Sequence, residues 1–219
     1  MIELPDFEKA FDYENNFYLS CDASRLKKIL AHYEIYKNTL DVPGDVFEFG
    51  ILKGCSFTRF AAFRQFYKQE DKKLIGFDSF GEFPETEFEP DVKERLRHIE
   101  LCGDESIDKD QLKDVLSRKG TGENIELIEG DITQTLPKYV EDNPDLKVSL
   151  INLDVDIYEP SKVILECLYP RLSKGGVLIL DDYGQWEGET KAVDEYFEGQ
   201  NVKIQSLPMF DKPLFIVKE

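Results

Sequence analysis

The stretch SLINLDVDIYEPSKVI, residues 149–164, joins a strand, a turn and a helix. Its mostly apolar run Leu150–Leu153 is typical of a strand buried on both faces, as in the parallel sheets of α/β proteins. Asp154 and Asp156 follow this strand directly, and the pattern becomes helical from Ser161. Aspartate is disfavoured in strands and costly to bury without a partner. The two acids at this strand end therefore need a cause outside the strand.

The rest of the chain alternates between strand and helix patterns in the same way. Further strands are predicted at Asp45–Gly50, Lys73–Asp78, Ile125–Asp131 and Val177–Leu180, and helices at about Asp22–Leu40, Ser56–Gln69, Asp108–Arg118, Leu136–Glu141, Ser161–Arg171 and Gly188–Phe197. This alternation implies an α/β fold, with a parallel sheet covered by helices on both faces. The chain closes with two short strands, VKIQSLP and PLFIVK. Such a terminal hairpin departs from the plain dinucleotide-binding pattern.

The composition describes one compact domain with an acidic surface. At 219 residues, with 41% hydrophobic and 12% aromatic residues, the chain is long enough for a sizeable core and contains no linker pattern. Its net charge of −18 disfavours nucleic acids and anionic membranes as partners. No signal-like or membrane-spanning stretch stands out, and four scattered cysteines indicate free thiols. We therefore expect a cytoplasmic protein.

An acid follows or ends every core strand. These positions are Glu48 (with Gly50), Asp78, Asp131, Asp154 with Asp156, and Asp181 with Asp182. In an open α/β sheet, ligands bind beyond the carboxyl ends of the strands. Any one of these acids could simply cap the following helix. Acids at all five strand ends favour a binding site at that edge of the sheet.

Part of this edge has the features of a nucleotide site. The turn EFGILKGCS, residues 48–56, contains two glycines that let backbone approach a ligand closely, but it matches neither a G-x-G-x-x-G fingerprint nor a P-loop. Asp78 stands where an acid commonly accepts hydrogen bonds from ribose. Phe80 could cover a flat base, and Asp131 could accept from an exocyclic amine.

The other part has the features of a metal site. Asp154, Asp181 and Asp182 come from strand ends that are expected to be neighbours, and could converge on one cation. Oxygen ligands without histidine or cysteine suit magnesium, manganese or calcium better than zinc. Asp156 lies beside this cluster, either at the start of the next helix or as a further ligand or base.

The segments that carry these acids resemble one known family. DVFEFGILKGCS, GFDSFGEFP, EGDITQTLP and LDVDIYEPSKVILECLYPRLSKGGVLILDDYGQWEGETKAVDEYF are similar to the macrocin O-methyltransferase family, in register from about residue 45 to 197. Members of this family methylate sugar hydroxyls. Val155, Ile157 and Thr190 depart from the family's usual residues, which leaves the sugar acceptor open.

The resemblance implies a class I methyltransferase fold, a Rossmann-like three-layer sandwich with a seven-stranded, mostly parallel sheet whose last strand is antiparallel. It implies S-adenosylmethionine and Mg²⁺ as cofactors, with Asp154, Asp181 and Asp182 as metal ligands and Asp154 or Asp156 as the base. Glu48, Gly50 and Ser56 would lie by the methionine part of the cofactor, Asp78 by its ribose, and Ser79 and Asp131 by its adenine; Phe80 and Asp154 complete the predicted cofactor site. Within one domain, residues 1–219, we expect a helical cap over residues 1–42 and a lid over 81–121.

The function expected from these features is Mg²⁺-dependent methylation of a hydroxyl on a deoxysugar that is nucleotide-activated or attached to a natural product. Three alternatives stay open: a haloacid-dehalogenase-like phosphohydrolase, a glycosyltransferase whose D-x-D motif holds a nucleotide sugar, and a non-catalytic binding domain. His32 and His98 are expected to be ordinary polar positions. The aromatic segment 7–18 could pair subunits into a dimer.

Overall fold

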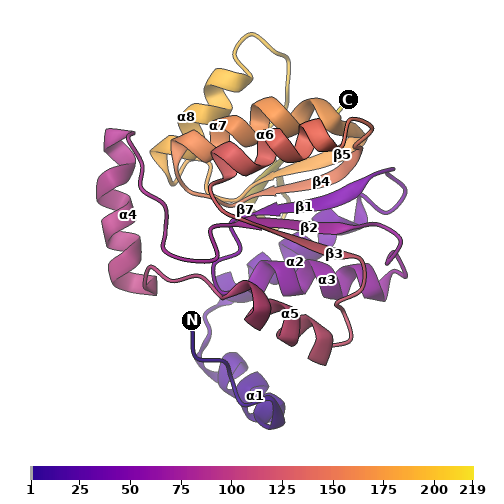
Figure 1. Ribbon diagram of the computed structural model, residues 1–219, viewed down its shortest axis with the longest axis vertical. Coiled ribbons are helices and arrows are strands. Elements are labelled where there is room, and N and C mark those ends of the chain that lie inside the picture. The colour runs from indigo at the N-terminus through magenta and orange to yellow at the C-terminus, as the bar shows by residue number, and fades with distance from the viewer. Residues whose placement is uncertain (1) are drawn as a thin grey trace.

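A twisted seven-stranded sheet forms the centre of the protein, with helices on both faces (Figure 1). The structure is a computed structural model, and it describes residues 2–219. The strands are β1 Asp45–Phe49, β2 Leu74–Asp78, β3 Ile125–Glu129, β4 Val148–Leu153, β5 Leu172–Leu180, β6 Gln205–Leu207 and β7 Phe210–Val217. Their order is β3-β2-β1-β4-β5-β7-β6, in which β1 to β5 are parallel and β7 runs antiparallel to both β5 and β6. The predicted sheet and its antiparallel last strand are confirmed.

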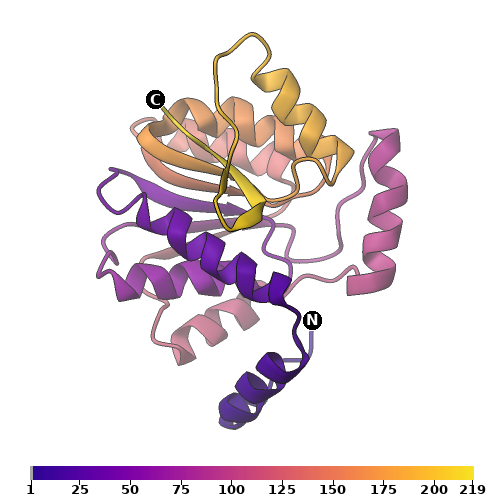
Figure 2. The same cartoon turned by 180° about the vertical axis from the view of Figure 1, so that it is seen from behind.

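The helices form the two outer layers. They are α1 Ala10–Ser20, α2 Ala23–Lys37, α3 Cys55–Phe66, α4 Glu89–Cys102, α5 Lys109–Arg118, α6 Ile132–Asp142, α7 Tyr158–Leu168 and α8 Glu187–Tyr196, with short 3-10 helices η1 Phe7–Lys9 and η2 Tyr169–Arg171. One buried cluster joins α6, α7 and α8 to one sheet face, and a second joins α2, α3 and α5 to the other. Figure 2 shows α2 lying across the second face, close to β7.

The predicted helix boundaries were wrong where a polar residue or a proline lies close to a helix start. α6 begins at Ile132 rather than Leu136, because Asp131 accepts a hydrogen bond from Thr133 N at 2.8 Å and caps the helix. α7 begins at Tyr158 rather than Ser161, since Pro160 is tolerated in a first turn, where its missing N–H has no helical partner.

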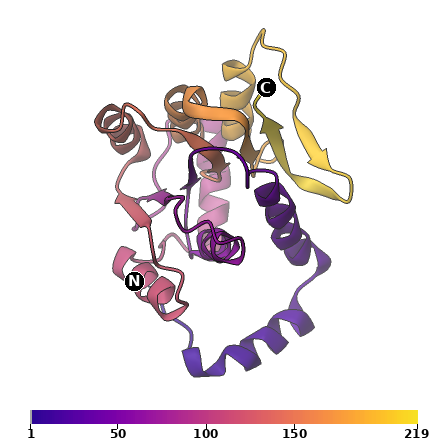
Figure 3. The ribbon, with the colours of Figure 1, turned by 90° about the vertical axis from the view of Figure 1, so that its right-hand side faces the viewer.

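One α-helix was not predicted. α4 lies in the acidic, proline-containing segment 81–121, and its Pro90 falls at a first-turn position that a proline tolerates. It stands off one end of the sheet (Figure 1). α1 lies within the helical segment expected over residues 1–42, but it buries none of its residues and projects from the body of the molecule (Figure 3). Within residues 2–219, no helix is both long enough and apolar enough to span a bilayer.

Candidate active site

Three central strands end at the same level and bring their following residues together. Phe49 pairs with Leu153, and Leu153 pairs with Leu180, so the carboxyl ends of β1, β4 and β5 are aligned. The alignment continues one residue further, where Asp154 N donates to Phe49 O and Asp181 N donates to Leu153 O, each at 3.1 Å. As a result, Asp154 and Asp181 lie side by side just beyond the carboxyl ends of β4 and β5.

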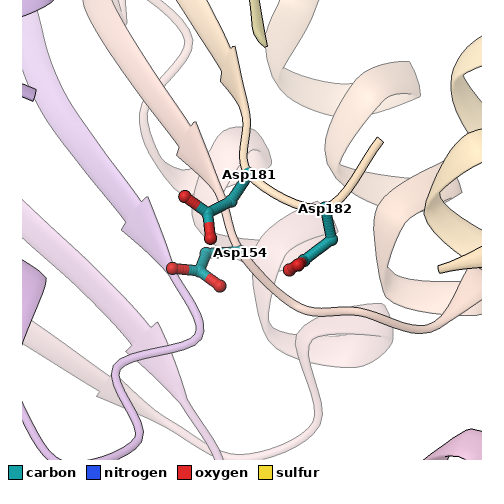
Figure 4. A group of neighbouring side chains, drawn as sticks. All are labelled: Asp154, Asp181 and Asp182. Carbon is teal, nitrogen blue, oxygen red and sulfur yellow. The ribbon is translucent and has the colours of Figure 1, made fainter. Parts of the chain in front are cut away.

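Asp154, Asp181 and Asp182 form a carboxylate cluster at this edge. Each offers an oxygen, and these oxygens lie within 4.8 Å of one another. Figure 4 shows Asp154 and Asp181 next to each other, with Asp182 turned toward them from the adjoining loop. The structure thus brings together the three acids that the sequence predicts as metal ligands.

The environment separates the pKa values of these three acids. Burial alone would raise the pKa of Asp181, but His32 and Lys28 outweigh it and hold that pKa at about 2. Burial and the neighbouring Asp181 charge raise the pKa of Asp182 to about 6. The same two causes raise the pKa of Asp154 well above its usual range. The positively charged side chains beside the cluster therefore do not neutralise all of its carboxylates. A bound metal cation would relieve the remaining repulsion between them.

Asp156 lies beside the cluster in a backbone conformation that aspartate adopts infrequently. Its φ is +64°, and it precedes Ile157, the N-cap residue of α7, so it does not itself cap the helix. Burial, followed by the charge of the neighbouring Asp182, raises the pKa of Asp156 well above its usual range. Backbone strain of this kind is concentrated at functional sites.

Lys28 and His32, four residues apart on α2, hold Asp181 from the helix side. Lys28 Nζ lies 2.6 Å from Asp181 Oδ2, and His32 Nε2 lies 3.7 Å from Asp181 Oδ1. Arg59 Nη1 lies 3.0 Å from His32 Nδ1; because guanidinium only donates, Nδ1 is the acceptor and Nε2 carries the proton that faces Asp181. His32 is fully buried, stacked on Phe60 and faces Asp181, a placement that the sequence did not predict.

Glu189 of α8 is a further acid that the sequence analysis missed. It is fully buried, and its Oε1 accepts a hydrogen bond from Asp182 N at 3.1 Å. Burial, and then the charge of Asp182, raise its pKa well above the usual range. No strand-end or motif signal marks Glu189, because it enters the site from the first turn of a helix.

The β1–α3 turn approaches the acidic cluster through Gly50. Gly50 has φ +81°, and a Cβ built there would lie 1.7 Å from Asp154 O. Glu48, fully buried in β1, accepts from the Ser56 hydroxyl, and burial raises its pKa to about 8. Its Oε2 has no hydrogen-bond partner among the described residues. Three of the predicted cofactor residues thus line one turn.

Asp78 is already bonded to protein donors. Its carboxylate accepts from Ile51 N at 2.6 Å, Leu52 N at 3.1 Å, Phe80 N at 2.7 Å and Ser106 Oγ at 2.6 Å, and the residue is 7% exposed. In this arrangement Asp78 organises the β1–α3 turn and ties residue 106 to it. A ribose hydroxyl would have to replace or share one of these donors.

The other predicted cofactor residues are also placed by local hydrogen bonds. Ser79 Oγ donates to Glu82 O at 3.0 Å, and Phe80, with φ +50°, packs against the core cluster that includes α3 and α5. Asp131 is exposed, and its carboxylate caps α6 through Thr133. Among the predicted cofactor residues, Asp131 thus serves as a helix cap, the role that any single strand-end acid could have.

A carboxylate from α4 clamps the loops that follow β4 and β5. Asp91 is 1% exposed and accepts from Tyr158 N and Gly188 N, each at 2.9 Å, at the first turns of α7 and α8. In return, Glu159 of α7 accepts from Thr86 Oγ1, Glu87 N and Phe88 N ahead of α4. These reciprocal bonds hold α4 against the loops that carry Asp156 and Asp182.

We predict that Asp91→Ala lowers the free energy of unfolding by about 2 kcal/mol or more, because two first-turn N–H groups lose their buried acceptor. Urea denaturation measures this change. Glu89→Ala removes an exposed acid from the same turn of α4 and serves as the control, with an expected loss near zero. Equal losses in the two variants would contradict the clamp.

Comparison with known proteins identifies the family. The family model for macrocin O-methyltransferase (TylF) matches residues 11–212. One relative is the 8-demethyl-8-(2,3-dimethoxy-alpha-L-rhamnosyl)-tetracenomycin-C 4'-O-methyltransferase from Streptomyces olivaceus. It is 31% identical over 144 residues, which cover 65% of this chain and 54% of that protein. Mycinamicin III 3''-O-methyltransferase from Micromonospora griseorubida is 29% identical over 148 residues, covering 65% and 56%. The chain thus spans about half the length of the curated relatives it matches.

Solved structures share the whole architecture. The calicheamicin methyltransferase CalS11 superposes with a TM-score of 0.76 at 26% identity, covering 98% of this chain and 86% of that one. The O-methyltransferase NovP gives a TM-score of 0.76 at 22% identity, covering 88% and 79%, and supports the fold alone. The sheet is therefore that of a class I methyltransferase, and the chain belongs to the macrocin O-methyltransferase family.

Proposed function

We propose that this protein transfers a methyl group from S-adenosylmethionine to a hydroxyl of a deoxysugar, with the help of Mg²⁺. One observation carries the proposal: in a chain of this family, Asp154, Asp181 and Asp182 meet beyond the aligned ends of β4 and β5. The name of one relative states a rhamnosyl group on its substrate, and that of another states the 3'' position of mycinamicin III. The sugar, and any nucleotide or aglycone it carries, is left open.

The residues of the cluster fit a hard divalent cation. All three donors are carboxylate oxygens, which Mg²⁺ prefers over nitrogen or sulfur. A bound Mg²⁺ would hold and acidify the acceptor hydroxyl, which is the chemistry that a sugar lacks at neutral pH. Asp154, Asp181 and Asp182 are the ligands we propose; before metal binds, His32 and Lys28 keep Asp181 ionised.

The remaining work belongs to side chains that align the acceptor and take its proton. Methyl transfer is an in-line displacement, so the acceptor oxygen must lie behind the methyl carbon. We propose Asp154 or Asp156 as the base, because both lie at the cluster and both have pKa values raised by burial. The clamp between α4 and the loops after β4 and β5 keeps these residues in position.

The cofactor site we propose comprises Glu48, Gly50, Ser56, Asp78, Ser79, Phe80, Asp131 and Asp154. The unpartnered Glu48 Oε2 fits the cationic methionine end of S-adenosylmethionine, since a buried carboxylate gains from an opposite charge. Gly50 leaves the turn without a side chain where the backbone passes closest to Asp154. Both features support a cofactor lying along the ends of β1 and β4.

Asp78→Ala is expected to weaken S-adenosylmethionine binding at least about tenfold, because a lost charge-assisted hydrogen bond is typically worth 1.5–3 kcal/mol. Calorimetry with S-adenosylhomocysteine and its 2'-deoxy analogue separates two roles. If Asp78 binds ribose, the analogue loses affinity for the wild type only; if Asp78 merely organises the turn, both proteins discriminate equally. Asp71→Ala, an exposed acid before β2, is the control.

The activity is tested by mass spectrometry of products from a panel of nucleotide-activated and natural-product-attached deoxysugars, incubated with S-adenosylmethionine and Mg²⁺. A mass gain of one methyl group on a sugar is the expected result. Transfer that persists undiminished after the metal is chelated would remove Mg²⁺ from the proposal. Release of inorganic phosphate without methylation would favour a phosphohydrolase instead.

We further propose a cytoplasmic homodimer in which a second copy covers α1. The four cysteines are free, as in a reducing compartment, and α1 exposes Phe11 (74%) and Leu19 (86%) while burying no residue. An isolated helix of this length is marginally stable in water.

Light scattering should give the mass of a dimer for the wild type and of a monomer for the double variant Phe11→Glu/Leu19→Glu. Met209→Glu changes an exposed residue outside α1 and serves as the control, which should remain a dimer. A monomeric wild type would contradict the proposal.

A further inference from the structure

The ammonium group of Lys28 lies against two of the three carboxylates that we propose as metal ligands. Lys28 Nζ is 2.6 Å from Asp181 Oδ2 and 3.6 Å from Asp154 Oδ2. These two acids come from adjacent strands, whereas Lys28 comes from α2, far away in the chain. A single lysine thus bridges the pair of acids that a divalent cation would also bridge.

Lys28 is more exposed to solvent than its neighbour His32. The Lys28 side chain is 38% exposed, whereas His32 is fully buried between Asp181, Arg59 and Phe60. Both of the ammonium's ion pairs in the described structure are with the cluster itself. Because a lysine carries its charge on a flexible four-carbon stem, the ammonium can leave the carboxylates without a change in the backbone of α2.

Lys28 and a divalent cation cannot hold the same carboxylates at full strength. A cation bound between Asp154 and Asp181 would lie close to the ammonium, and like charges at such distances repel strongly in a partly buried site. Both also need the same carboxylate oxygens. At the same time, the cluster brings oxygens of Asp154, Asp181 and Asp182 within 4.8 Å of one another, and the Lys28 ammonium pairs with two of these three carboxylates.

We propose that Lys28 is the built-in counter-ion of this site, held by Asp154 and Asp181 until a divalent cation displaces it. Lys28 therefore stabilises the metal-free protein and weakens its affinity for metal. His32 has the other role, because it is buried against Asp181 and would stay there to orient the Asp181 carboxylate when the ammonium leaves. The inference rests on the proposed metal-dependent function, and it assigns opposite effects to two side chains on one face of α2.

The test compares Mn²⁺ affinity among variants at fixed pH and ionic strength, measured by electron paramagnetic resonance of the free ion. Lys28→Met should bind Mn²⁺ at least about tenfold more tightly than the wild type, because the competing charge is gone. Lys28→Arg keeps the charge and should bind like the wild type. Lys27→Met removes an equal charge from the exposed neighbouring position and should also bind like the wild type.

Thermal unfolding gives a second readout that does not depend on activity. Without metal, Lys28→Met should melt below Lys27→Met, and saturating Mn²⁺ should raise its melting temperature by more. If Lys28→Met does not fold without metal, Lys28→Gln takes its place, since glutamine is neutral but still donates a hydrogen bond.

The outcomes separate the inference from the proposed function. Equal or weaker Mn²⁺ affinity in the neutral Lys28 variants would overturn the counter-ion role while leaving the metal site intact. If neither the wild type nor the neutral Lys28 variants bind Mn²⁺, the proposed metal site is wrong, and the counter-ion role is wrong with it. Tighter binding in Lys27→Met as well would show a general charge effect, and would also contradict the proposal.

Discussion

Asp182→Asn should lower the rate of methyl transfer at least about a thousandfold, while S-adenosylmethionine affinity stays within about twofold of the wild type. Asparagine keeps the shape of aspartate but removes one of the three carboxylates that meet beyond β4 and β5. Losing a metal ligand removes both the acidification and the orientation of the acceptor hydroxyl. Asp154→Asn should lose as much, and it also removes one of the two candidate bases.

Single-turnover transfer and calorimetric cofactor binding measure the two quantities on the same samples. Asp182 is the cleaner position, because Asp154 also belongs to the proposed cofactor site. Asp145→Asn, in the exposed loop ahead of β4, removes a charge without touching the cluster and should keep full activity. Retained transfer in Asp182→Asn, or a parallel loss of cofactor affinity, would place Asp182 outside the role of metal ligand.

Gly50→Ala should lower the free energy of unfolding by about 3 kcal/mol or more, because two penalties add at this position. The φ of +81° is unfavourable for any residue with a Cβ. The added Cβ would also lie 1.7 Å from Asp154 O, a backbone atom that moves only if the end of β4 moves. We therefore expect the variant to lose cofactor binding as well, since Asp154 and the β1–α3 turn are pushed apart.

Gly199→Ala is the matched control for this close approach. Gly199 has a similar φ, +73°, but a Cβ there would meet nothing within 4 Å. It should therefore cost only about 1 kcal/mol, the conformational penalty alone. Urea denaturation of both variants measures the difference. Equal costs would mean that the backbone at Gly50 relaxes away from Asp154 without loss.

Much of the sheet could be predicted because its signals are local. A strand buried on both faces requires consecutive apolar residues, and the glycine or acid that ends it is adjacent in sequence. The terminal hairpin was predicted from two short strands after the last helix, and the antiparallel last strand from the resemblance to the family. The first residues of α6 and α7 and the existence of α4 were not predicted. Asp131 caps α6, and Pro160 and Pro90 lie in the first turns of α7 and α4, where they do not break the helix.

The sequence by itself determined the parallel sheet and the acids at its carboxyl edge, because strand periodicity and chain direction place Asp154, Asp181 and Asp182 there whatever else packs around them. Only the tertiary structure decided what faces those acids. Lys28, His32 and Glu189 reach them from α2 and α8. No local pattern marks a helical residue that contacts a strand end 153 residues away, as Lys28 contacts Asp181. The charge of a site depends on every side chain within a few ångströms, and those neighbours are set by packing rather than by sequence distance.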